Sequence, residues 1–188
     1  MNQSEILAYL DQGAKARLGI DINQIESLGV EISKRLMAGN KILLMGNGGS
    51  AADSQHIATE FVSRFECERK ALRAISLTVD TSILTAISND YSYEKVFERQ
   101  IEAQADEGDI VIGISTSGNS KNVINAIKKA NDMNCLTIAM TGQSGGYVAN
   151  IAQHTIKVKS NKTSIIQEVH IAIGHIISKI AEDMIVGK

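Results

Sequence analysis

Two segments of the chain place histidines close to carboxylates at helical spacing. His56 and Glu60 are four residues apart in a run of small and apolar residues, so on a helix they share one face. A second, isoleucine-rich segment carries four further polar side chains: Gln167, Glu168, His170 and His175. A lone histidine on such a helix is usually a hydrogen-bonded core residue. Because three of the four histidines fall in these two segments, we expect them to share a site.

A divalent metal could be held by His56, Glu60, Gln167 and His175, and two imidazoles among the ligands favour zinc. The spacing differs from the H-E-x-x-H motif of zinc proteases. Gln167 and His175 are eight residues apart, about 12 Å along a helix axis, which is a long reach for one metal from one helix. Either both side chains lean inward, or the site draws on helices of different subunits.

Glycine- and serine-rich segments follow three apolar runs of the chain. They are residues 46–50 (GNGGS), 113–120 (GISTSGNS) and 141–146 (TGQSGG). Glycines let the backbone approach a ligand closely, and hydroxyls with helix N-terminal amides hold a phosphate without a lysine cluster. The alternative is a set of turns in which Ser117 or Ser120 only caps a helix. The serine-rich segment, in register with the first glycine segment, favours a phosphate site.

The first glycine segment also fits the dinucleotide-binding pattern G-x-G-x-x-G/A, at Gly46, Gly48 and Ala51. That pattern requires an acidic residue about 20 positions further on, at the end of the second strand. The acid at that point is Asp80, 34 positions after Gly46. A dinucleotide site also has no use for the serine-rich segment, so we predict that the chain binds no dinucleotide.

Short apolar runs alternate with helical patterns and predict the fold class. The runs are residues 42–45, 74–77, 110–114, 136–140 and 155–158, and the helical patterns include residues 51–65, 122–131 and 162–185. This order predicts an α/β fold with a doubly wound, flavodoxin-like sheet of five parallel strands in a three-layer αβα arrangement. The fifth run alternates as an edge strand does. The first 40 residues predict an N-terminal helical extension with an apolar stripe at Ile25, Leu28 and Ile32.

Composition narrows the classes of partner. The 188 residues suffice for one domain, and 19 Lys plus Arg stand against 21 Asp plus Glu, without blocks of like charge. No apolar run reaches the roughly 20 residues of a spanning helix. The first residues lack the basic region of a signal peptide, and Cys67 and Cys135 are isolated, which suits a reducing cytosol. We therefore expect a cytoplasmic protein with no nucleic-acid or membrane partner.

A phosphate site beside a carboxylate and an imidazole suits proton transfer on a small phosphorylated sugar. Aldose–ketose isomerisation needs one group to take a proton from the carbon next to the carbonyl, and another to move protons on the oxygens. It also needs a cation or a donor that stabilises the enediolate. Glu60 as base and His175 as acid meet the first two needs, and an optional metal that polarises the carbonyl would meet the third.

Four segments, in order, resemble one protein family. They are GNGGSAADSQH followed by ATEF, SND at 88–90, GISTSGNS at 113–120 and IQEVHIAIGHII at 166–177. Over roughly residues 40–185 the chain is similar to the sugar isomerase (SIS) domain of the sedoheptulose 7-phosphate isomerases, the phosphoheptose isomerases. The resemblance implies a single SIS domain over residues 1–188, in which helices of residues 1–40 pack on the domain and on partner subunits.

The resemblance also implies a reaction and a site. Members convert sedoheptulose 7-phosphate to D-glycero-D-manno-heptose 7-phosphate, the first step towards ADP- or GDP-heptose for lipopolysaccharide or other surface glycans, in homotetramers with active sites between subunits. The catalytic pair would be Glu60 and His175, and one zinc ion per subunit would be bound by His56, Glu60, Gln167 and His175. The implied substrate-binding residues are Asn47, Gly48, Gly49, Glu60, Asn89, Asp90, Ser115, Thr116, Ser117, Ser120 and Gln167.

A related group with the same fold and glycine loop supplies the alternative function. Its members are non-catalytic phosphosugar-binding or regulatory proteins, some of which bind the replication initiator. That group lacks the carboxylate and the second C-terminal histidine, which this chain keeps as Glu60 and His175, so we favour the enzyme. The chain departs from the isomerases at Ile165, where an arginine is common, and at Ser164, where an acidic residue can occur.

Overall fold

The computed structural model describes residues 1–187. Its sheet has five parallel strands: β1 (Ile42–Gly46), β2 (Ala74–Ser76), β3 (Ile110–Ser115), β4 (Leu136–Thr141) and β5 (His154–Lys157). The strand order β2-β1-β3-β4-β5 is the flavodoxin-like order, which reverses between β1 and β3. The predicted fold class is confirmed, and β5 lies at an edge of the sheet as its alternating pattern indicated.

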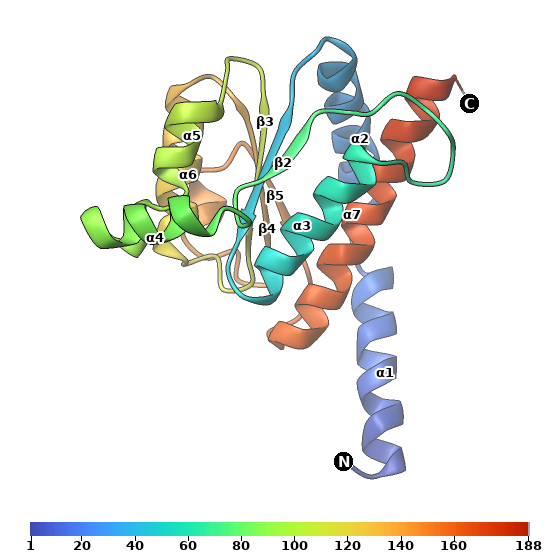
Figure 1. Cartoon of the computed structure of the whole chain (residues 1–188). Coiled ribbons are helices and arrows are strands. Elements are labelled where there is room, and N and C mark those ends of the chain that lie inside the picture. Colours follow the sequence, from blue (N-terminus) through green and yellow to red (C-terminus); the bar gives the residue numbers. More distant parts are fainter. Residues whose placement is uncertain (188) are drawn as a thin grey trace.

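Helices cover both faces of the sheet (Figure 1). One face is covered by α2 (Ile22–Met37), α3 (Gly49–Val62) and α7 (Thr163–Val186), and the other by α5 (Glu98–Gln104) and α6 (Lys121–Asp132). The remaining elements are α1 (Gln3–Leu18), α4 (Thr81–Asp90) and the short 3-10 helices Tyr93–Lys95 and Val148–Asn150. The predicted helical segments coincide with α3, α6 and α7 to within a few residues, whereas no sequence pattern had singled out α4 or α5.

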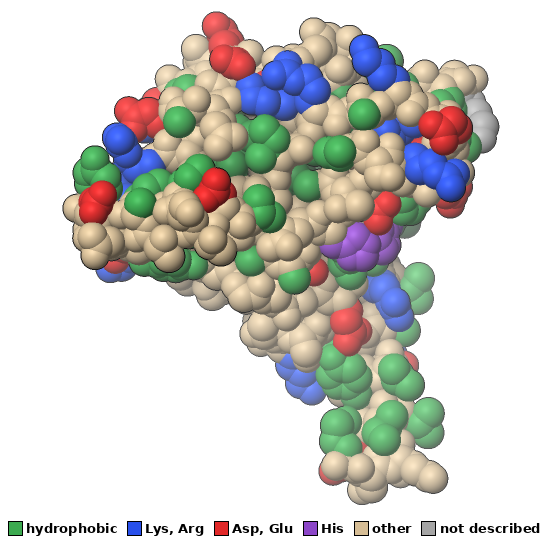
Figure 2. Space-filling model, viewed as in Figure 1, with side chains coloured by type: hydrophobic (Ala, Val, Ile, Leu, Met, Phe, Trp, Pro, Cys, Tyr) green, Lys and Arg blue, Asp and Glu red, His purple; other side chains and the backbone are tan. Residues whose placement is uncertain are grey.

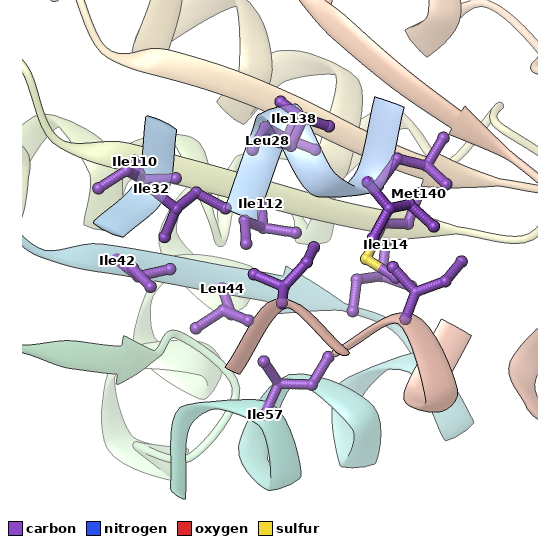
Figure 3. Close-up of a cluster of buried hydrophobic side chains, with 14 of the residues drawn as sticks. Leu28, Ile32, Ile42, Leu44, Ile57, Ile110, Ile112, Ile114, Ile138 and Met140 are labelled. Carbon is purple, nitrogen blue, oxygen red and sulfur yellow. The ribbon is translucent and has the colours of Figure 1, made fainter. Parts of the chain in front are cut away.

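Alternation along the strands builds two hydrophobic cores. Ile42 and Leu44 of β1 point to the face covered by α2, α3 and α7, whereas Leu43 and Met45 point to the face covered by α5 and α6. Every residue of β1, β3 and β4 is buried, as expected for strands covered on both sides. The first core, shown in Figure 3, seats α3 and α7 against the sheet, and these two helices carry the predicted site residues.

The N-terminal helix α1 projects away from the rest of the molecule (Figure 1). It packs on the first half of α7, where Ala16 is buried and the Tyr9 hydroxyl donates to Glu168 Oε1 at 2.5 Å. The N-terminal half of α1 carries the exposed apolar side chains Ile6, Leu7 and Leu10, and Met1 before the helix is exposed as well. A helix with such a stripe is stabilised when the stripe is covered. None of the helices in residues 1–187 combines the length and apolarity that a membrane span requires.

Candidate active site

The glycine-rich and serine-rich loops lie side by side at the carboxyl edge of the sheet. β1 and β3 are neighbours, and Gly46 at the end of β1 pairs with Ile114 near the end of β3. The strand order reverses at this point, which is where open α/β sheets bind ligands. The two loops line a hollow of about 320 Å³, which we call the cradle. Its lining residues are Asn47, Gly48, Gly49, Ser50, Ile114, Ser115, Thr116, Ser120, Thr163 and Gln167.

Glycines shape the first wall of the cradle. Gly48, which precedes α3, has a φ of 56°, a left-handed conformation that residues with a side chain rarely adopt. A methyl group on Gly49 would collide with the amide of Gln167 on α7. These two glycines therefore bring the N-terminus of α3, the positive end of its dipole, to the cradle and let α7 approach it closely.

Hydroxyls form the second wall of the cradle. Ser115 is buried, and its Oγ is hydrogen-bonded to Ser120 Oγ at 2.9 Å. Ser120 occupies the N-cap position of α6, but its side chain makes no capping hydrogen bond. Ser117 Oγ instead accepts from the backbone N–H of Asn119 at 3.1 Å and faces a neighbouring polar hollow. Capping therefore does not explain Ser120, whereas Ser117 has a local role in its turn.

Two residues that sequence reasoning missed hold Asn47 in the cradle wall. Asn47 Nδ2 donates to Asn122 Oδ1 at 2.9 Å, and Asn47 Oδ1 accepts from Asn122 Nδ2 at 2.8 Å and from the Tyr93 hydroxyl at 3.0 Å. The one sequence signal for Asn122 is its position in the first turn after Ser120. Thr163 was missed as well, although the first residue of the helix after β5 reaches the same edge of the sheet.

Three ionisable side chains converge away from the cradle, between α3 and α7. His56 Nε2 lies 3.1 Å from Glu60 Oε1 and 3.3 Å from His175 Nε2. The helices meet closely because Gly174 leaves room for Ile57. We call His56, Glu60 and His175 the histidine cluster. It is open on one side, since the His56 side chain is 51% exposed, and Figure 2 shows histidine surface with acidic atoms beside it.

The other polar residues predicted on α7 have different partners. His170 is fully buried, and its Nε2 lies 3.2 Å from the carbonyl oxygen of Thr141 at the end of β4. Burial lowers the pKa of His170 to about 4, so the ring is neutral at pH 7 and its Nε2–H donates to that carbonyl. Glu168 accepts from the Tyr9 hydroxyl. These two residues therefore anchor α7 to β4 and to α1, and they do not join the histidine cluster.

A half-buried carboxyl, that of Asp53, lies one turn before His56 on α3. Oδ2 of Asp53 has no hydrogen-bond partner among residues 1–187. Burial raises the pKa of the Asp53 carboxyl, and the positive charge that His56 can carry opposes the rise. The face of α3 that carries the cluster thus also carries one carboxyl oxygen without a hydrogen-bond partner among residues 1–187.

The histidine cluster suits a divalent metal. One ligand atom from each of its three residues lies within 4.8 Å of the other two. Two imidazoles with a carboxylate are the protein ligands of a known class of catalytic zinc site, which leaves a position for water or substrate. The facing Nε2 atoms of His56 and His175 have two stable arrangements: one nitrogen carries a proton, or both bind a cation. The donor set therefore fits zinc.

The cradle and the histidine cluster lie at different positions along the axes of α3 and α7. Gly49 and Glu60 are separated on α3 by about 16 Å along the axis, and Gln167 and His175 on α7 by about 12 Å. Both separations exceed the distance from phosphorus to carbonyl carbon in an extended heptose phosphate. Gln167, predicted as a fourth metal ligand, lies at the cradle against Gly49. Within one chain, the histidine cluster and the cradle are therefore set apart along the two helices.

Two predicted substrate-binding residues also lie apart from the cradle. Asn89 and Asp90 are the last residues of α4, where Asn89 Nδ2 donates to Asp90 Oδ1 at 2.9 Å. Asp90 lines a separate hollow of about 300 Å³ between α4 and α5. At the position where an arginine is common in the isomerases, Ile165 is 1% exposed and lies beside Gly13 of α1. The departure at Ile165 therefore provides an apolar seat for α1.

Comparison with known proteins places the chain in one class. Residues 8–142 match the SIS domain family. The chain is 53% identical to the probable phosphoheptose isomerase of Thermoplasma acidophilum over 175 residues, which cover 93% of this chain and 96% of that protein. It is 56% identical to the phosphoheptose isomerase of Aquifex aeolicus over 162 residues, which cover 86% of this chain and 85% of that protein.

Solved structures give the same result. The phosphoheptose isomerase of Neisseria gonorrhoeae superposes with a TM-score of 0.90 at 37% identity, covering 96% of this chain and 98% of that one. For the phosphoheptose isomerase of Francisella tularensis the TM-score is 0.92 at 32% identity, covering 97% and 100%. The fold, the cradle and these matches define the chain as a member of the SIS domain family. Within that family it belongs with the phosphoheptose isomerases.

Proposed function

We propose that the protein is a phosphoheptose isomerase that converts sedoheptulose 7-phosphate to D-glycero-D-manno-heptose 7-phosphate. The observation that carries the proposal is the convergence of His56, Glu60 and His175 in a chain that also has a hydroxyl-lined cradle. A regulatory protein that only binds phosphosugars has no need of Glu60 and His175. The similarity to phosphoheptose isomerases at 53% identity favours the same reading.

The cradle binds the phosphate end of the substrate. Backbone amides at the start of α3 and the hydroxyls of the serine-rich loop supply the neutral donors that a phosphate needs. The proposed contacts are Asn47, Gly48, Gly49, Ser115, Thr116, Ser117, Ser120 and Gln167. Asn89 and Asp90 would contact the sugar in the assembled oligomer, since they lie away from the cradle of their own chain.

The histidine cluster performs the proton transfers. Glu60 takes a proton from C1 of the ketose, and the electrons of the C–H bond form the C1–C2 double bond of the enediolate. The same carboxyl then returns the proton to C2, while His175 moves a proton from O1 to O2. The sum is an internal redox exchange between C1 and C2, so the reaction needs no external oxidant or reductant.

Zinc is the proposed metal, one ion per subunit. The residues that would hold it are His56, Glu60 and His175, with Gln167 as the fourth ligand from another subunit. When bound, zinc would polarise the carbonyl and stabilise the charge of the enediolate. His56 contacts both Glu60 and His175. It would therefore hold these two side chains in place whether or not the metal is bound.

A homotetramer with active sites at subunit interfaces is the proposed assembly. The separation of about 12–16 Å along α3 and α7 favours a site in which the cluster of one chain meets the cradle of another. Exposed apolar side chains on α1, including Leu7 at 68% and Leu10 at 58%, favour packing of residues 1–40 on a partner subunit as well as on their own domain. Residues 1–188 would form a single SIS domain within that assembly.

The proposed setting follows from the reaction. The product is the precursor of ADP- or GDP-heptose, and the protein would catalyse the first step of heptose supply for lipopolysaccharide or another surface glycan. Phosphorylated sugars of this kind are cytoplasmic metabolites, so we propose a cytoplasmic enzyme. Net charge of -2 without a basic patch in the sequence supports a small-molecule substrate, with neither nucleic acid nor membrane as partner.

An assay of the purified protein tests the proposal. Sedoheptulose 7-phosphate is incubated with protein that has been stripped with a chelator, with and without added zinc, and the products are separated by anion-exchange chromatography. We expect the aldose heptose 7-phosphate to appear, with faster turnover in the presence of zinc. Absence of the aldose in both conditions would contradict the isomerase, and binding of the sugar phosphate without turnover would favour the regulatory class.

A further inference from the structure

A buried ion pair lies next to the histidine cluster, between the end of α3 and α7. Arg69 Nε is 3.2 Å from Glu182 Oε1, and the two side chains are 2% and 0% exposed. Removing two charges from water costs free energy unless each is well paired and hydrogen-bonded. Apolar residues of similar size could fill the same space at less cost, so the contacts of the pair must explain its presence.

Arg69 holds the last turn of α3. The helix ends at Val62 and has no glycine cap, so its last carbonyl groups lack partners within the helix. Arg69 Nη2 donates to the carbonyl oxygen of Glu60 at 2.6 Å, and Nη1 donates to that of Phe61 at 2.9 Å. A cation at the C-terminal end of a helix is also favoured by the helix dipole. Arg69 therefore fixes the backbone from which the Glu60 side chain projects.

Glu182 holds the loop that follows α3. The backbone N–H of Phe65 donates to Oε1 at 3.0 Å, and those of Glu66 and Cys67 donate to Oε2 at 2.7 and 2.9 Å. Consecutive N–H groups in such a turn form a concave anion site. Burial alone would raise the pKa of Glu182, but these three hydrogen bonds and Arg69 outweigh it and lower the pKa below its usual value.

The ion pair of Arg69 and Glu182 is also linked to His175, through Phe65. Glu182 follows His175 by seven residues, or two turns, so both side chains lie on the face of α7 that meets α3 and its following loop. Because Glu182 fixes the backbone of Phe65, the Phe65 ring is placed 5.7 Å from the His175 ring, centre to centre. Two of the three cluster residues are thereby tied to one buried ion pair.

We propose that Arg69 and Glu182 are positioning residues that set the distance between Glu60 on α3 and His175 on α7. Arg69 fixes the turn that carries Glu60, Glu182 fixes the loop that packs on His175, and the ion pair between Arg69 and Glu182 joins the turn to the loop. The catalytic consequence rests on the proposed isomerase function, whereas the consequence for metal affinity and geometry does not. The cradle, at the other ends of the two helices, is outside the reach of the pair.

Substitutions that keep one property of the pair at a time test this proposal. Arg69→Lys keeps the positive charge but loses the fork that serves Glu60, Phe61 and Glu182 together. Glu182→Gln keeps the shape but loses the charge. The matched control is Lys179→Ala, which removes an exposed link at 3.1 Å between Glu66 and α7 without touching the pair. All variants are measured at a temperature where circular dichroism shows them folded.

We expect Arg69→Lys and Glu182→Gln to lower kcat about tenfold with KM for the sugar phosphate unchanged, and to weaken zinc binding about tenfold in competition with a chromogenic chelator. Lys179→Ala should have the kcat, the KM and the zinc affinity of the wild type. A purely structural role for the pair would lower only the melting temperature and leave kcat and zinc affinity as in the wild type, and this result would overturn the proposal.

A second measurement separates this proposal from the proposed function. If the wild type does not isomerise the sugar phosphate, the isomerase proposal fails, and zinc affinity still decides the role of the pair. If the wild type binds no zinc either, crystal structures of wild type and Arg69→Lys decide it. We expect the Nε2 atoms of His56 and His175, 3.3 Å apart in the wild type, to separate in the variant. Unchanged positions of all three cluster side chains would contradict the proposal.

Discussion

The two ends of the α3–α7 helix pair differ in how their functional groups are held. At the N-terminal ends, the cradle consists of backbone amides, hydroxyls and amide side chains on loops, and these are bonded to one another, as in Ser115–Ser120 and Asn47–Asn122. Further along both helices, the histidine cluster consists of ionisable side chains on helix surfaces, of which the His56 side chain is half exposed. The cradle is neutral, and its side chains are hydrogen-bonded to one another. The histidine cluster is ionisable, and it is partly open to solvent.

In the proposed function, this difference separates substrate binding at the cradle from proton transfer at the histidine cluster. The sheet fixes the cradle, since both of its walls follow neighbouring parallel strands at the point where the strand order reverses. Helix packing fixes the histidine cluster, through the contact of Ile57 with Gly174 and the buried pair behind it. The proposed site between subunits would let both regions act on one small substrate.

The largest expected effect on turnover is that of replacing Glu60, the proposed base. Glu60→Gln keeps the size of the side chain but cannot accept a proton from carbon, so we expect kcat to fall about 10³-fold while the sugar phosphate still binds. Turnover and, separately, binding of the substrate by calorimetry check this outcome. The matched control is Glu68→Gln, which alters an exposed carboxylate in the following loop and should have no effect. Undiminished turnover in Glu60→Gln would remove Glu60 from the mechanism.

A shared site predicts complementation between two inactive chains. Ser120→Asp places a negative charge in the cradle, where it would repel a phosphate, and its histidine cluster remains intact. When this chain is co-expressed with Glu60→Gln, mixed oligomers contain sites with an intact cradle and an intact base. About a quarter of the sites should be restored if subunits mix at random in a symmetric oligomer.

Activity of the mixed oligomers is measured after purification by two different affinity tags, with each variant alone as the control. If every site is built from one chain, the mixed oligomers stay inactive because each chain lacks either its base or its cradle. That result would exclude a shared site and require the cluster to reach the cradle by a rearrangement within the chain.

The same difference explains how far the sequence could predict the structure. Buried apolar runs such as residues 110–114 predict strands directly, and the strand-end rule then brings the loops after β1 and β3 together. The i, i+4 pair His56 and Glu60 follows from helical spacing alone. Their approach to His175 depends on the relative shift of α3 and α7, which is set by Gly174 and Ile57 and leaves no local signal.

The residues that were missed share a physical reason. Asn122 and Tyr93 act through hydrogen bonds to Asn47 that join positions 75 and 46 residues apart, so no local pattern marks them. Glu182 is a carboxylate within an apolar helix, which indicates a buried partner without identifying it. Similarly, the sequence predicts Gln167 both as a metal ligand with His175 and as a substrate contact, and the packing of α7 against Gly49 places it at the cradle of its own chain.

A smaller effect is expected in the cradle. Ser120→Ala removes one hydroxyl that would donate to the phosphate, and loss of one hydrogen bond to a charged group should raise KM about tenfold with kcat nearly unchanged. The matched control is Ser144→Ala, which alters the neighbouring polar hollow but not the cradle. Steady-state kinetics of both variants check this prediction. Equal effects of the two substitutions would show that the phosphate site extends across both hollows.

The smallest effect on turnover is expected at His170, which lies on α7 between the two regions. Its pKa is about 4 in the folded chain and about 6.5 when unfolded, so the unfolded state binds the extra proton between these values. Stability from neutral His170 is therefore complete above pH 6.5 and is lost as the pH falls towards 4. Between pH 7 and pH 5 this loss is about 2 kcal/mol.

His170→Gln keeps a donor for the Thr141 carbonyl but does not titrate. We expect the variant to lose about 2 kcal/mol less stability than the wild type between pH 7 and pH 5, with kcat at pH 7 close to that of the wild type. Urea unfolding at both pH values and at one protein concentration measures the difference, because stability of an oligomer depends on concentration. His154→Gln, at an exposed histidine on β5, is the control. If His170→Gln kept the acid sensitivity of the wild type, that sensitivity would not arise at His170.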